Sequence, residues 1–277
     1  MKNIIILTKQ TMQEAFARKV FITFFIVSAV TLILGSLLFM LTPLANFTTG
    51  MEESMKHSKI PITMDPLIMV VQILKNLIVF PLYTLGLFLS IFSVSSFIPN
   101  LLEKGHIDII LSKPVARSQV LIGKYLGGLI VVLLNVTFLV GGIWLLIGLK
   151  FSVWDTNFLY IILTVTFAFA TLYSLIILIG ILSQSHILSM MLCYIIFIAF
   201  SPVISKLHYA EFITNKFYKA LVDILYYIHP KTADIWGMTE SILKGEAIAS
   251  YQPIYTSAAF LVLIFGLSIF IFSKKDY

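Results

Sequence analysis

Six long apolar stretches without any Asp, Glu, Lys, Arg or His constrain this chain of 277 residues more than any other feature. A helix needs about 20 such residues to cross the hydrocarbon core of a bilayer. Within that core the backbone must satisfy its own hydrogen bonds, which favours helices for runs of this length. We therefore predict an all-α integral membrane protein with a single transmembrane domain over residues 1–277. Its six predicted spans are residues 20–41, 77–97, 126–149, 158–182, 187–204 and 254–272. Lys75, just before the second span, is expected on an interfacial turn with its amine at the headgroups.

The composition agrees with this class. The chain is 59% hydrophobic and 12% charged, with a mean hydropathy of +1.00, whereas soluble domains carry roughly 25% charged residues. The single cysteine, Cys193, excludes an internal disulfide and a thiolate-rich metal site, and we expect it to be an inert hydrophobic residue. The net charge of +6 does not indicate nucleic-acid binding, because membrane proteins collect Lys and Arg on one side.

The distribution of charge predicts the orientation in the membrane. With six spans, both termini lie on the same side as the connections after the second and fourth spans. That side carries ten of the 19 cations but only four of the 13 acidic residues, so the whole positive excess falls there. By the positive-inside rule it is the cytoplasmic side of the cytoplasmic membrane. We therefore expect both termini in the cytoplasm.

Two further segments are expected to be structured. Residues 1–19 are basic, and Ile5, Met12 and Phe16 can share a helical face, which is typical of an interfacial helix lying on the membrane. A basic tail is the alternative. Residues 205–253 form a long polar segment outside the membrane, with an apolar helical stripe beginning at Leu221. His229-Pro230 should end the helix that carries this stripe, and Thr232 could cap the next one. We expect this outer segment to be helical and partly apposed to the membrane.

The connection at residues 103–124 is short, charged and patterned. Ile107, Ile110 and Leu111 would share one face of a short helix, and Pro114 disfavours helix at the residue before it. Ser118 could then cap a new helix leading into the third span. This arrangement suits a surface on which another protein docks. The alternative is an ordinary charged loop that stays out of the lipid.

The remaining residues offer little chemistry. Spans without ionisable residues argue against an ion-coupled transporter, which needs such groups at membrane depth. The five histidines are scattered and predict no metal site. Gly123-Lys124-Tyr125 lacks the upstream glycine and the hydroxyl of a P-loop, so no ATP site is expected on this chain. Any energy for transport must therefore come from a partner.

Residues of the charged connection resemble the signature of type-2 ATP-binding-cassette (ABC) permeases. That pattern runs E-x-G-[TS]-x-x-x-L-L-S-x-P-[VI]-[ST]-R, followed by L-G-K-[FY]-L-G. The departures here are His106 and Ala116, where the family usually has a hydroxyl residue. The length of the chain and its residues 229–235, HPKTADI, look most like the permease of nitrous-oxide-reductase maturation systems. The matching positions are Glu103, Gly105, residues 109–117, and residues 121–127.

The resemblance implies that two permease copies pair and that separate P-loop ATPase chains, which hold the ATP, dock from the cytoplasm. It implies that the short helix is a cytoplasmic coupling helix, and that the outer segment forms re-entrant helices that close the exit. The apolar spans would suit a lipid-like cargo or simply contact with lipid. No catalytic, cofactor or metal residues are expected. The predicted ATPase-coupling residues are Glu103, Gly105, Ile107, Ile110, Leu111, Pro114, Arg117, Gly123 and Lys124.

Two classes of function remain open from the sequence. The first is the permease subunit of an ABC exporter with an unidentified substrate. The second is a membrane scaffold or assembly protein whose cytoplasmic loop recruits a partner other than an ATPase.

Overall fold

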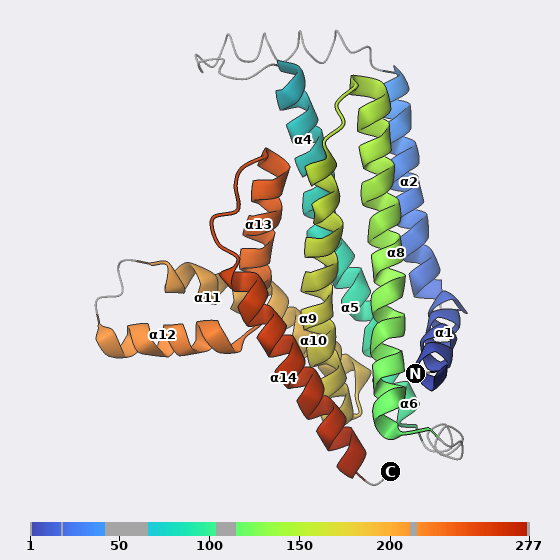
Figure 1. The fold of residues 1–277 in the computed structure, drawn as a ribbon, viewed down its shortest axis with the longest axis vertical. Helices are drawn as coiled ribbons and strands as arrows, with labels where there is room; N and C mark the ends of the chain where they lie inside the picture. The colour runs from blue at the N-terminus through green and yellow to red at the C-terminus, as the bar shows by residue number, and fades with distance from the viewer. Residues whose placement is uncertain (1, 18, 42–65, 104–114, 211–214, 276–277) are drawn as a thin grey trace.

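The computed structural model describes residues 2–17, 19–41, 66–103, 115–210 and 215–275. Every regular element in these ranges is helical, which confirms the predicted all-α class (Figure 1). The first half of the chain forms α1 (Lys2–Ala17), α2 (Lys19–Leu41), α4 (Pro66–Pro81), the π-helical turn η1 (Leu82–Gly86), α5 (Leu87–Ser95), α6 (Phe97–Leu101) and α8 (Arg117–Phe151). The second half forms the 3-10 turn η2 (Thr156–Leu159), α9 (Tyr160–Ser183), α10 (His186–Tyr194), the π-helical turn η3 (Ile195–Phe200), α11 (Ser201–His208), α12 (Lys216–Ile228), α13 (Thr232–Lys244) and α14 (Gln252–Lys274).

Five helical segments are long and apolar enough to cross a membrane. A sixth is reached if Asn3–Ala17 and Ile22–Leu37, which meet at 68°, count as one bent span. The bend separates α1 from the apolar α2 at the place where the sequence predicts an interfacial helix followed by the first span. The five segments are Val70–Leu101, Arg117–Phe151, Thr156–Ser183, His186–His208 and Gln252–Lys274.

Helix α9 lies at the centre of the bundle, in contact with α5, α8, α10, α13 and α14. Most of its apolar residues are buried, whereas α14 leaves most of its surface open. Aromatic packing joins α9 to α8, because the Tyr173 ring stacks on Tyr125 with ring centroids 5.3 Å apart. The Tyr173 hydroxyl also donates to the Lys124 carbonyl at 2.9 Å. A side chain at Gly128 would collide with this ring, since a Cβ there would lie 2.7 Å from it.

The second span differs from the sequence prediction. We expected it at residues 77–97, with Lys75 on an interfacial turn that reaches the headgroups. Instead the helix continues from residue 66, and Lys75 is 5% exposed. Its amine pairs with the Asp155 carboxylate at 2.7 Å and lies 5.3 Å from the Phe158 ring. Burial is possible because Asp155, which begins the η2 turn elsewhere in the chain, supplies a counter-charge.

This pairing also corrects the expectation that the spans hold no ionisable residue. The expectation holds only for the boundaries drawn from the sequence. The second span contains Lys75, and the third, which begins at Arg117, contains Lys124. Both amines are buried beside acidic side chains from other elements. The spans predicted from hydropathy excluded both lysines, because a charge without a partner is costly in lipid and the partners could not be seen in the sequence.

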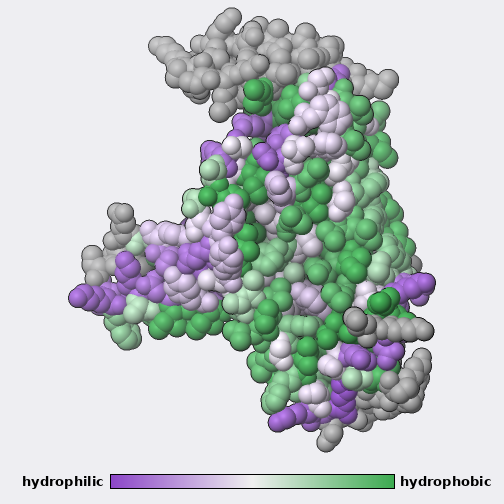
Figure 2. Space-filling model, in the orientation of Figure 1, coloured by the Kyte–Doolittle hydropathy of each residue, from purple (hydrophilic) through white to green (hydrophobic). Residues whose placement is uncertain are grey.

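The outer segment is helical, as predicted. Helices α11 and α12 form an arm that projects from the bundle, and α13 then runs along the side of the bundle (Figure 1). The arm is amphipathic: its upper surface is mostly hydrophilic and its lower edge hydrophobic (Figure 2). The exposed apolar residues of α12 include Phe217, Leu221, Ile224 and Ile228. That the segment lies against a membrane and closes an exit stays a prediction.

Two predicted helix caps are wrong. The N-cap of α8 is Ala116, one residue before Arg117, and no side chain caps it, so Ser118 already lies inside the helix. The N-cap of α13 is Lys231 rather than Thr232. In both places a tertiary contact fixes the helix start: Arg117 binds the end of α14, and Lys231 donates its backbone N–H to the Ser257 hydroxyl at 3.1 Å.

The Lys75–Asp155 pair should be tested by breaking and then removing it. Asp155→Asn keeps a side-chain oxygen to accept from the Asn157 backbone N–H, but it leaves the buried Lys75 ammonium without a counter-charge. We expect the free energy of unfolding to fall by about 3 kcal/mol. Adding Lys75→Met should recover most of this loss in thermal unfolding. Lys244→Met, which breaks an exposed pair with Glu240, is the control and should change the melting temperature little. Equal losses for the two pairs would contradict a buried role for Lys75.

Candidate functional site

The predicted coupling residues divide into two groups. Five of them lie outside the described residues: Gly105, Ile107, Ile110, Leu111 and Pro114. Of the other four, Glu103 is exposed just beyond the end of α6. The remaining three, Arg117, Gly123 and Lys124, lie on the first turns of α8 and contact other helices. The structure therefore shows what the coupling stretch is attached to.

Arg117 binds the end of α14. Its Nη1 donates to the Lys275 carbonyl at 2.5 Å and to the Phe272 and Ser273 carbonyls at 3.5 and 3.4 Å. The last carbonyls of a helix have no partner within it and carry partial negative charge, so a guanidinium is a favourable cap. The Lys275 amine in turn donates to the Ile181 carbonyl of α9 at 3.0 Å. The first residue of α8 is thus tied to the last turns of α14 and α9.

Gly123 allows α1 to lie directly on α8. A Cβ at Gly123 would be 2.5 Å from the Leu7 Cβ, and one at Gly127 would be 2.5 Å from the Thr11 Cβ. Residues four apart share a helical face, so the two glycines make a groove in which α1 rests. A side chain at either position would push the helices apart.

Lys124 adds a charged contact to the same junction. Its amine forms an ion pair with the Glu14 carboxylate of α1, with side chains 9% and 29% exposed. It also lies 5.8 Å from the Phe97 ring of α6. We call Arg117, Gly123 and Lys124, with their partners on α1 and at the end of α14, the α8 junction. Its glycine and lysine face helices of the same chain.

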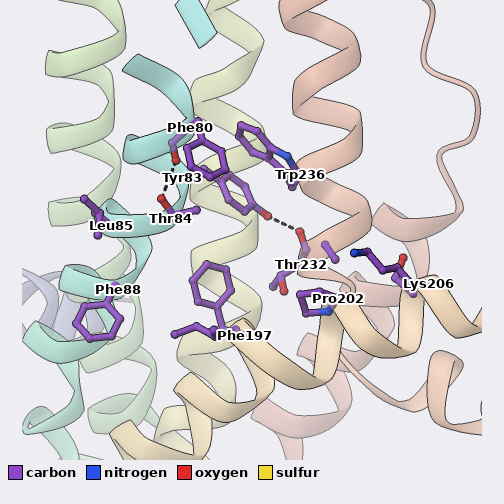
Figure 3. A pocket seen from close by; sticks show the side chains of 13 residues that line it. Phe80, Tyr83, Thr84, Leu85, Phe88, Phe197, Pro202, Lys206, Thr232 and Trp236 are labelled. Atoms are coloured by element: carbon purple, nitrogen blue, oxygen red, sulfur yellow. Dashed lines mark hydrogen bonds between the residues drawn. The ribbon is translucent and has the colours of Figure 1, made fainter. Parts of the chain in front are cut away.

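A second feature is a cavity of about 530 Å³ between the second span, the fifth span and α13 (Figure 3). Residues of both π-helical turns line it, among them Tyr83 and Phe197. The Tyr83 hydroxyl donates to the Thr232 carbonyl at 2.6 Å, and its ring lies 5.0 Å from that of Trp236. We call it the aromatic cavity. Its aromatic lining residues are Phe80, Tyr83, Phe88, Phe197 and Trp236, and its polar ones are Thr84, Ser205, Lys206 and Thr232.

This cavity was not predicted from the sequence. Its lining comes from three segments that are well separated in the sequence, and no local pattern marks a π-helical turn. The only available signal was the cluster of aromatic and hydroxyl residues around Pro81 and Pro202, the prolines of the second and fifth spans.

A buried polar cluster lies behind the cavity at the start of α13. Lys231 is fully buried, and its amine sits 3.9 Å from the Tyr226 ring centroid and 4.5 Å from that of Tyr227. The Ser205 hydroxyl donates to the Asp234 carboxylate at 2.6 Å. Among the described residues, four buried polar atoms without a hydrogen-bond partner fall in this short stretch: His229 Nε2, Lys231 Nζ, Thr232 Oγ1 and Asp234 Oδ2.

Burial controls the ionisation of this cluster. Desolvation lowers the pKa of Lys231 to about 8, although the nearby Asp234 carboxylate favours the charged form. Desolvation likewise lowers the pKa of His229. The described ranges contain no group of three or more His, Cys, Asp or Glu side chains able to hold a metal ion.

A family model described as ABC-2 family transporter protein matches residues 25–277, which is nearly the whole chain. No curated protein matches the sequence.

The pKa of Lys231 makes a pH-dependent prediction. In the unfolded chain this lysine has its ordinary pKa of 10.5, so between about pH 8 and 10.5 the unfolded state binds more protons and stability rises with pH. Lys231→Met removes this contribution, so the melting temperature of the variant relative to wild type should fall by several degrees across that window. Lys244→Met, at an exposed lysine whose pKa Glu240 raises, should not show this trend. A constant difference for Lys231→Met would show that its amine is not desolvated.

Proposed function

Because the chain belongs to the ABC-2 transporter family and is the membrane permease subunit of an ABC transporter, we propose that it exports its cargo using ATP hydrolysed by a separate P-loop ATPase. The ATPase docks on the cytoplasmic side at residues 103–117 and moves the predicted coupling helix. The likeness of residues 229–235 to the permease of nitrous-oxide-reductase maturation systems is a finer assignment and remains a prediction from the sequence.

The observation that carries this proposal is the α8 junction. The coupling stretch leads directly into Arg117, which holds the end of α14. Two turns further along, Gly123 and Lys124 hold α1 through close packing and an ion pair. A push on the coupling stretch would therefore reach the first, third and last helices together. An ordinary solvated loop would need no such attachment.

The orientation proposed from charge agrees with the arrangement of the chain. The start of α1, the end of α14 and the start of α8 lie toward the same end of the bundle, whereas α2 ends at the other (Figure 1). This is the arrangement expected if both termini and the coupling stretch are cytoplasmic, in a cytoplasmic membrane. The export direction is part of the proposal, and ATP is held by the partner chain.

A second permease copy and lipid are the proposed partners within the membrane. Helix α14 leaves large apolar side chains exposed, including Tyr255, Val262 and Leu263, each more than two-thirds exposed. Apolar surface of this extent needs lipid or another chain to cover it. The ABC-2 architecture that the sequence resembles has two permeases, which supports a dimer.

The docking proposal is tested by charging the apolar face of the coupling stretch. Ile107→Asp and Leu111→Asp should each weaken ATPase binding at least tenfold. An unpaired charge buried at a contact costs several kcal/mol, and about 1.4 kcal/mol is already tenfold in affinity. Pull-downs and native gels on the same membranes measure binding and assembly together. Asp108→Asn, off the apolar face, is the matched control and should leave binding intact.

A stable Leu111→Asp permease that still binds its ATPase would contradict this proposal. Failure of any ATPase to copurify with the wild-type chain would instead favour a scaffold whose loop recruits a different partner.

A further inference from the structure

The aromatic cavity has the properties of a binding site rather than a packing defect. Its volume of about 530 Å³ falls in the range of sites that hold organic molecules. We propose that the cavity binds the cargo, and that it selects a flat aromatic molecule carrying one anionic group. This assignment rests on the proposed transport function, because it identifies the cavity as a stop on the transport route.

The shape of the cavity favours a flat ring. Rings from three elements, those of Phe80, Tyr83 and Trp236, stand close together on one side, with centroids of neighbouring rings 5.0 and 5.6 Å apart (Figure 3). Phe88 and Phe197 line it from the second and fifth spans. Aromatic side chains prefer offset-stacked or edge-to-face contact with another ring, which an aromatic cargo would supply.

The polar groups of the cavity favour an acceptor on the cargo. The Thr84 hydroxyl donates to the Phe80 carbonyl and the Ser205 hydroxyl to Asp234, so both of these donors are used. The Thr232 hydroxyl is different, because this residue is 1% exposed and its Oγ1 has no hydrogen-bond partner. A buried donor without a partner is costly. Its oxygen is covered in this structure, so an acceptor on a ligand would satisfy it once the start of α13 opens toward the cavity.

The charge near Thr232 favours an anion. Lys206 lines the cavity from α11, and Figure 3 shows its amine directed toward the start of α13. Behind the cavity, the buried Lys231 amine offsets the charge of the Asp234 carboxylate. The local balance of these three groups is one positive charge. A carboxylate on the cargo could therefore accept from Thr232 and pair with Lys206.

The walls of the cavity can adapt to a cargo. Both spans that form it are irregular at the point where they line it: Tyr83 lies in the π-helical turn η1 and Phe197 in η3. Such turns are rare and occur frequently at functional sites. Here two such turns, one from each span, line the same cavity. The backbone around the proposed cargo is therefore irregular on two sides.

The site is tested by binding alone, without any ATPase. The permease in phosphatidylcholine nanodiscs is titrated with 1-pyrenebutyrate, a flat aromatic carboxylate that quenches tryptophan fluorescence by energy transfer. Of the three tryptophans only Trp236 lines the cavity, while Trp144 and Trp154 pack on each other. Energy transfer to pyrene acts over distances comparable to the bundle, so the titration uses a Trp144→Phe, Trp154→Phe variant in which Trp236 is the remaining tryptophan. We expect saturable quenching of Trp236 after subtraction of empty nanodiscs.

Three variants and one control give the assignment its specificity. Ala233→Phe fills the cavity and should weaken binding at least tenfold, whereas Ala259→Phe on an exposed face of α14 should leave it unchanged. Lys206→Gln should weaken pyrenebutyrate about tenfold but leave the neutral 1-pyrenebutanol unaffected. Thr232→Val, which keeps the side-chain volume but removes the hydroxyl, should also weaken the binding of pyrenebutyrate.

Two results would overturn the proposal. Quenching that Ala233→Phe and Thr232→Val both leave unchanged would mean that the probe only partitions into the bilayer. Equal binding of the alcohol and the carboxylate, indifferent to Lys206→Gln, would mean that the cavity accepts apolar chains such as lipid tails. Neither result depends on the ATPase, so a failure of the transport proposal would show separately, as an absent partner with the binding pattern intact.

Discussion

A cation within a membrane bundle must find a counter-charge or a cluster of carbonyls, and this requirement organises the structure. Placing an unpaired charge near the middle of a bilayer costs about 3 kcal/mol on insertion scales. Lys75 and Lys124 meet the requirement through acidic side chains of other elements, Asp155 and Glu14. Arg117, where α8 begins, binds the last carbonyls of α14. Each contact joins segments that are distant in the sequence, so together they fix how the apolar helices are arranged.

The two features proposed to function lie in different parts of this arrangement. The α8 junction gathers α1, α8, α9 and α14 where the coupling stretch enters. The aromatic cavity lies among the second span, the fifth span and α13. Helix α9 contacts both groups of elements and is the most buried of the spans. At the α8 junction the helices are regular and closely packed at glycines, so they would move together. At the aromatic cavity the π-helical turns would allow the two spans to bend.

Local pattern was sufficient for some elements and not for others. The apolar runs predicted the membrane class, and the stripe at Leu221 together with the break at Pro230 predicted a helix that ends where α12 ends. The pairing of Lys75, the burial of Lys231 and the start of α8 depend on residues distant in the sequence, so hydropathy and capping rules placed them wrongly or not at all. Of the coupling motif, the structure shows how Arg117, Gly123 and Lys124 are held. The apolar face predicted at Ile107 lies outside the described residues.

The central claim is that α1 and the end of α14 are fixed to the base of α8 and move with it. Spin labels at two exposed positions, Ile5 on α1 and Phe270 on α14, report this directly in a Cys193→Ala background with the partner ATPase present. We predict that the distance between them is the same with and without ATP, while the distance from Ile5 to a label at Phe217 on α12 changes. A change of several ångströms between Ile5 and Phe270, with the distance to α12 constant, would contradict the account.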